Sequence, residues 1–144
     1  MRGQCMCGAV SYKAEPEKMR VSACHCGMCR RWSGSALMAV AVPEGMMRFD
    51  VAEHIRTLQS SPWAERAWCD KCGSDLYYRV TAEGPYQGQY HISLGTFDAP
   101  GEFELYEEIY VDCKPANFAY AGERSMKTKA EIEAMFAPPP GDKP

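Results

Sequence analysis

Residues 65–80, ERAWCDKCGSDLYYRV, contain two cysteines that are separated by two residues and followed directly by a glycine. The alternating residues on both sides predict a strand, a tight turn and a returning strand. Cys69 and Cys72 on such a turn are typical of one half of a tetrahedral zinc site. The other half has to come from elsewhere in the chain, so the fold depends on which cysteines complete the site.

Cys5 and Cys7 are the available second pair, in the stretch GQCMCGAVSYKA (3–14). This stretch predicts one strand with both sulfurs on the same face, and Gly8 permits a turn or a close approach of the backbone. We therefore expect a closed, structural zinc site of four thiolates. A redox pair or buried free cysteines are the alternatives, although no βαβ context supports thioredoxin-like chemistry.

Three further cysteines lie in CHCGMCRRWSGS (24–35). Cys24, Cys26 and Cys29 are one thiolate short of a closed site, and a catalytic zinc keeps one exchangeable position. The fourth ligand is His25, Cys113 or an exchangeable group, and His25 has poor geometry because it lies between two ligands. A zinc with three thiolates carries a net charge of −1, which favours a substrate thiol over activated water.

Two arginines and a serine directly follow the third cysteine of this cluster. Arg30 and Arg31 can offset the negative site and pair with substrate carboxylates, or they are solvated surface charges. Ser33 can donate a hydrogen bond to a ligand, or it only connects the cluster to the next strand. We regard all three as candidate substrate-binding residues.

The composition excludes several classes of function. The chain has 144 residues and a net charge of −3, which argues against nucleic-acid binding. No apolar run approaches the roughly 20 residues of a membrane span, and no export signal precedes the first motif. We expect a cytoplasmic protein in which the clustered ones among its eight cysteines serve as metal ligands or in catalysis rather than in disulfides. The sequence leaves the oligomeric state open.

Strands dominate the remaining predicted elements. We expect strands over 19–24, 35–42, 55–61, 90–97 and 105–112, and a mainly β fold of packed antiparallel sheets in a single domain, 1–136. Thr128 and Glu131 form a capping box, which predicts a short C-terminal helix in TKAEIEAMF (128–136). Residues 137–144, APPPGDKP, are predicted to be a disordered tail.

Four stretches together resemble the family of glutathione-dependent formaldehyde-activating enzymes, which includes the domain of centromere protein V. They are GQCMCGAVSY (3–12), CHCGMCRRWSGS (24–35), WCDKCGSDLYY (68–78) and IYVDCKPANF (109–118). The resemblance covers about residues 2–120. It implies a β-tent type of fold and two zinc ions, a structural one at Cys5, Cys7, Cys69 and Cys72 and a catalytic-type one at Cys24, Cys26 and Cys29.

The resemblance also implies a carbon–sulfur lyase that joins glutathione and formaldehyde and cleaves their adduct. A different thiol or aldehyde is compatible with the same motifs. The alternatives are a non-catalytic thiol carrier or protein-interaction module in which both zinc ions are structural, and a redox sensor. Closure of the second site by Cys113 would favour the structural alternative.

Overall fold

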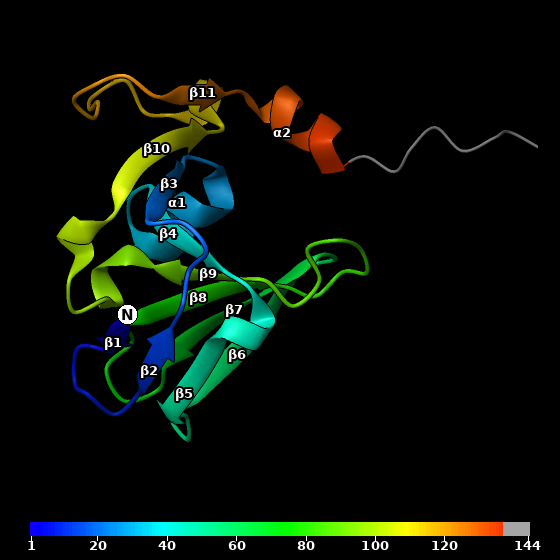
Figure 1. Cartoon of the computed structure of the whole chain (residues 1–144). Coiled ribbons are helices and arrows are strands. Elements are labelled where there is room, and N and C mark those ends of the chain that lie inside the picture. The colour runs from blue at the N-terminus through cyan, green and yellow to red at the C-terminus, as the bar shows by residue number, and fades with distance from the viewer. Residues whose placement is uncertain (137–144) are drawn as a thin grey trace, which may run out of the picture.

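The computed structural model describes residues 1–136, which form eleven strands and two α-helices (Figure 1). The strands belong to two sheets of three and eight strands. The predicted mainly β fold with a short C-terminal helix is therefore confirmed. The predicted tail, 137–144, lies outside the described residues.

The small sheet is antiparallel and has the order β1-β2-β5. Its strands are β1 (Arg2–Gln4), β2 (Ser11–Ala14) and β5 (Met47–Val51). The single strand predicted over 3–14 is wrong, because a turn separates β1 from β2. Gly8 adopts a φ of 75° in this turn, a left-handed conformation that glycine adopts at low cost.

The large sheet has the order β11-β10-β3-β4-β9-β8-β7-β6. Most of its pairs are antiparallel, and β10 runs parallel to both β3 and β11. Its strands are β3 (Arg20–Cys24), β4 (Leu37–Val42), β6 (Ile55–Ser61), β7 (Ala64–Cys69), β8 (Asp75–Val80), β9 (Tyr90–Ser93), β10 (Glu104–Ile109) and β11 (Ser125–Lys127).

Two of the predicted strands are shorter than expected. The strand predicted over 90–97 ends at Ser93 and continues as a 3-10 turn, Leu94–Thr96. The strand predicted over 105–112 ends at Ile109, before the 3-10 turn Val111–Cys113. Tyr110 separates β10 from that turn and has a φ of 56°, which ends the extended conformation.

The two faces of the large sheet are buried differently. One face packs against the small sheet, with Val40 and Ile92 fully buried beside Tyr12 of β2. Leu37 and Ala39 alternate with Val40 along β4, so they lie on the opposite face. They form a second cluster with Cys29 of α1 (Gly27–Ser33), which covers that face.

The two helices differ in how well the sequence predicts them. The capping box of α2 (Lys129–Phe136) is present, since the Thr128 N–H and hydroxyl both donate to the Glu131 carboxylate, at 2.7 and 2.8 Å. Helix α1 was not predicted. It has seven residues, begins with a glycine and has Cys26 as its N-cap, a residue type outside the usual capping set.

Candidate metal centres

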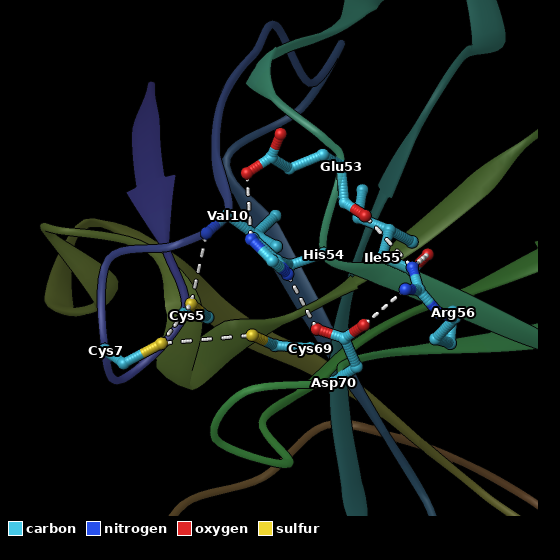
Figure 2. A network of polar contacts seen from close by, with 9 residues as sticks. All are labelled: Cys5, Cys7, Val10, Glu53, His54, Ile55, Arg56, Cys69 and Asp70. Carbon is cyan, nitrogen blue, oxygen red and sulfur yellow. Dashed lines mark hydrogen bonds and ion pairs between the residues drawn. The ribbon is translucent and has the colours of Figure 1, made fainter.

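The four-cysteine group comprises Cys5, Cys7, Cys69 and Cys72, whose sulfurs all lie within 4.8 Å of one another. Cys5 and Cys7 lie in the turn between β1 and β2, while Cys69 ends β7 and Cys72 lies in the turn before β8. Sγ of Cys7 lies 3.6 Å from that of Cys5 and 3.9 Å from that of Cys69 (Figure 2). This group therefore joins the small sheet to the large one.

Donors around the four-cysteine group suit thiolate ligands. The Val10 N–H donates to Sγ of Cys5 at 3.3 Å. Burial acts to raise the pKa of Cys5, but this hydrogen bond and the neighbouring sulfurs lower it below its ordinary value. The hydroxyl of Ser74, 3.2 Å from Sγ of Cys72, lowers the pKa of Cys72 to about 6. The pKa of Cys7 is raised instead, to about 11. The convergence of four sulfurs is therefore the feature that fits a structural zinc ion.

A polar network holds the segment next to Cys69 in place (Figure 2). The Asp70 carboxylate contacts Nδ1 of His54 at 2.9 Å and Nη2 of Arg56 at 2.5 Å. Nε2 of His54 lies 2.9 Å from the Glu53 carboxylate. These contacts connect the turn that bears two of the cysteines to the start of β6.

The three-cysteine group comprises Cys24, Cys26 and Cys29, and its sulfurs also lie within 4.8 Å of one another. Cys24 ends β3, Cys26 caps α1, and Cys29 lies in the first turn of that helix. Sγ of Cys26 accepts a hydrogen bond from the Cys29 N–H at 3.3 Å. Contacts with the sulfurs of Cys24 and Cys29 lower the pKa of Cys26, while contacts with the sulfurs of Cys26 and Cys29 raise the pKa of Cys24. The group therefore favours a thiolate at Cys26.

Neither candidate for a fourth protein ligand belongs to the three-cysteine group. His25 is 1% exposed and places Nε2 2.8 Å from Oε1 of Glu108. Cys113 is exposed in the turn after β10. Within residues 1–136 the group has three members, one fewer than the four ligands of a closed tetrahedral zinc site.

Arg66 on β7 is a residue near this group that the sequence analysis missed. Its side chain is buried, and Nη2 donates to Sγ of Cys29 at 3.4 Å. The guanidinium lies over the rings of Tyr78 and Trp32, at 5.2 and 5.9 Å from their centroids. The available signal was an arginine at an inward position of a predicted strand, three residues before Cys69.

The structure places the three predicted substrate-binding residues differently. Arg30 lines a cavity of about 290 Å³ together with His25, Ser35, Asn117 and Phe118, among others. Arg31 is exposed, and its Nη1 donates to the carbonyl of Gly27 at 3.4 Å.

The hydroxyl of Ser33 lies 2.9 Å from the Cys29 carbonyl and 2.8 Å from the Ser35 carbonyl. The single hydroxyl proton of Ser33 is therefore donated to one of these two backbone carbonyls. Of the three predicted residues, Arg30 is the one that lines the cavity.

The fold and the two sulfur clusters define a β protein with two candidate thiolate metal centres, one with four ligands and one with three. A family model described as glutathione-dependent formaldehyde-activating enzyme matches residues 1–113. The chain belongs to this family. The match includes both cysteine groups and ends before Asn117 and Phe118.

Two known proteins are similar to this chain, one in sequence and one in fold. A protein of Schizosaccharomyces pombe described as an uncharacterized lyase is 31% identical over 131 residues, which are 90% of this chain and 92% of that protein. The crystal structure of a Rhodobacter sphaeroides protein is similar in fold, with a TM-score of 0.57 and 23% identity. The similarity covers 68% of this chain and 88% of that one.

The helices of the described part give no sign of a membrane span. Neither α1 nor α2 is long and apolar enough to cross a bilayer.

Proposed function

We propose that this protein is a zinc-dependent carbon–sulfur lyase that acts on the adduct of a thiol, glutathione in the first instance, with formaldehyde or a similar aldehyde. The four-cysteine group holds a structural zinc ion and the three-cysteine group holds a catalytic-type one. The observation that carries the proposal is the three-membered sulfur group with no fourth ligand within residues 1–136. The family and the lyase-named relative support the reaction class.

The reaction forms one bond between the thiol sulfur and the aldehyde carbon. The thiol proton ends on the former carbonyl oxygen, so there is no net oxidation or reduction, and the lyase direction breaks the same carbon–sulfur bond. A zinc ion at the three-cysteine group supplies a soft Lewis-acid position that favours a thiol in its thiolate form. The protein contributes orientation, which accounts for a large part of the rate when two reactants are held together.

The cavity beside α1 is the proposed place for the polar part of the thiol. Arg30 supplies a cation, while Ser35 and Asn117 supply hydrogen-bonding groups. A guanidinium is suited to a carboxylate such as those of glutathione. We assign carboxylate binding to Arg30 rather than to Arg31, because Arg31 is turned towards the carbonyl of Gly27.

The same proposal assigns the protein to a reducing compartment, such as the cytoplasm. All eight cysteines are free, and seven of them converge in one group of four and one group of three that are suited to metals. We propose that residues 1–136 act as one domain, with a small-molecule thiol as partner and neither a nucleic acid nor a membrane.

Exchange spectroscopy tests this function. In a mixture of formaldehyde and glutathione, nuclear magnetic resonance measures how fast the free thiol and its adduct interconvert. The zinc-loaded protein should accelerate this exchange, and Cys26→Ser should return it to the buffer rate while keeping one zinc ion and the fold. Exchange that is no faster with the wild-type protein than without it would contradict the proposal.

A further inference from the structure

The side chain of Arg66 is a buried cation without a carboxylate at ion-pair distance. It is 3% exposed, and no aspartate or glutamate within residues 1–136 lies within 4.0 Å of its nitrogens. Its Nη1 atom is buried and has no hydrogen-bond partner in the same part of the chain. A buried guanidinium without a counter-charge is strongly destabilising. The carboxyl of Asp75 is near enough to interact with Arg66 electrostatically, but burial raises the pKa of Asp75, which weakens it as a counter-charge. A negative group in direct contact with the guanidinium would therefore stabilise it.

The polar contact that Arg66 does make is with the three-cysteine group. Its Nη2 atom donates to Sγ of Cys29 at 3.4 Å. Three thiolates and one divalent zinc ion sum to a charge of −1, which is equal and opposite to that of one guanidinium. The loaded centre would supply a counter-charge in direct contact with Arg66, in addition to the more distant carboxyl of Asp75.

Two aromatic rings fix the direction of the guanidinium. It lies over Tyr78 of the neighbouring strand β8 and over Trp32 of α1. Trp32 belongs to the same helix as Cys29, so the ring and the sulfur approach the guanidinium from one element. Rotation of Arg66 away from the sulfur would forfeit both ring contacts.

We propose that Arg66 is a positioning residue of the three-cysteine centre: it balances the centre's negative charge and orients Cys29, so that the centre retains a divalent metal. This inference rests on the metal centre of the proposed function. Arg66 lies on β7, outside the cysteine motif. Part of the metal affinity of the three-cysteine group would thus depend on a residue outside that motif. Partners of this kind commonly change metal affinity by about 10- to 100-fold.

Arg79 on β8 offers a matched control. It also lies over a tyrosine, at 5.2 Å from the ring centroid of Tyr90. Unlike Arg66, it has carboxylate partners, Glu44 and Glu65. It therefore shares the aromatic contact and lacks the link to a sulfur.

Cobalt titration of the metal-free full chain, monitored through sulfur-to-cobalt charge-transfer absorption and followed by competition with a chelator, tests the proposal. The wild type should bind two equivalents. Arg66→Met should bind the equivalent at the three-cysteine group at least tenfold more weakly and the other with unchanged affinity. Arg79→Met should match the wild type, and Arg66→Lys should lie between wild type and Arg66→Met because it keeps the charge without the planar fork.

A double-mutant cycle separates this role from a merely structural one. Cys26→Ser removes the proposed centre, and with it the counter-charge in direct contact with Arg66. Arg66→Met should then raise the melting temperature or leave it unchanged in the Cys26→Ser background, and lower it in the zinc-loaded wild type. An equal decrease in both backgrounds would overturn the proposal.

The outcomes also separate this inference from the proposed function. A wild type that binds one metal equivalent would contradict the three-cysteine centre itself, and Arg66 with it. Two equivalents in the wild type with unchanged affinities in Arg66→Met and Arg66→Lys would contradict the role of Arg66 alone. If Arg66→Met does not fold, Arg66→Lys gives the decisive affinity.

Discussion

The sulfurs of the two cysteine groups differ in the donors that surround them. In the four-cysteine group, Cys5 contacts a backbone N–H and Cys72 a serine hydroxyl, both neutral donors. In the three-cysteine group, Cys29 contacts the guanidinium of Arg66. A hydrogen bond from a charged donor is about twice as strong as one from a neutral donor. The three-cysteine group therefore receives the stronger hydrogen bond, although it has one sulfur fewer than the four-cysteine group.

Cys72→Ser should remove one metal equivalent and leave the protein unfolded or aggregated. Structural zinc contributes apparent free energies of ~10–16 kcal/mol in small peptides, which is of the same order as the total stability of a domain. Metal analysis and circular dichroism measure the two effects. Cys113→Ser is the control, because Cys113 is exposed and outside both groups, and it should behave as wild type. A soluble, folded Cys72→Ser variant with two metal equivalents would contradict the structural role.

Arg30→Gln should raise KM for glutathione about tenfold, since a lost charge-assisted hydrogen bond is worth ~1.5–3 kcal/mol and 1.4 kcal/mol corresponds to a factor of ten. Arg31→Gln, its matched control, should change KM less than about twofold. Steady-state rates of thiol–aldehyde exchange at varied glutathione concentration give both values. Equal effects of the two substitutions would show that the cavity beside α1 does not bind the carboxylate.

At the scale of elements, the strands on both sides of the Cys69–Cys72 turn could be predicted because alternation of apolar residues is a local signal. The turn between β1 and β2 could not, since Cys5 and Cys7 fit a strand equally well by alternation. Helix α1 is too short for helical periodicity to be visible in the sequence. The parallel pairing of β10 with β3 also lacks a local signal, because it joins residues about eighty positions apart.

Strand β10 carries a carboxylate that connects the three-cysteine segment to the residues after Ile109. Glu108 is 1% exposed and contacts His25 at 2.8 Å, Lys114 at 3.3 Å and Arg124 at 2.6 Å. Burial acts to raise the pKa of Glu108, but these three contacts outweigh it and lower the pKa below its ordinary value. The stabilisation from Glu108 is therefore present above the ordinary pKa and is lost as the pH falls through the lowered one.

Glu108→Gln should lower the free energy of unfolding at pH 7 by about 3 kcal/mol, because it leaves buried cations without their carboxylate. Glu107→Gln, one position earlier, removes the carboxylate partner of Lys127, whose side chain is 31% exposed. This substitution should lower the free energy of unfolding by less than about 1 kcal/mol. Urea denaturation of both variants with zinc bound measures the difference. Equal decreases in the free energy of unfolding for the two variants would contradict the role of Glu108 as the carboxylate partner of these buried groups.

At the scale of the whole molecule, the cysteine groups were the part of the site that the sequence predicted best. Their members lie within two or three residues of one another in each motif, so spacing alone suggests the partition. Arg66 and Glu108 lie about forty and eighty residues from the three-cysteine motif, and their approach to it depends on the order of strands in the large sheet. An arginine at an inward strand position signals that Arg66 is buried, but no local pattern shows which residues Arg66 and Glu108 contact.

The four-cysteine group also organises the whole molecule. It connects the turn of the small sheet to the β7–β8 turn of the large sheet, while the three-cysteine group lies at the end of β3 and in α1 (Figure 1). The first group thus joins the sheets, and the second lies where a strand ends and a short helix begins. This separation agrees with one structural and one functional centre.

Zinc K-edge X-ray absorption of the fully loaded protein, with and without glutathione, tests the central claim most directly. The control ligand is a glutathione analogue in which a methyl group replaces the thiol. The mean number of sulfur ligands per zinc should rise on addition of glutathione, as the three-sulfur centre gains a fourth, and should not change with the analogue. A sulfur shell that glutathione leaves unchanged would contradict a thiol-accepting centre.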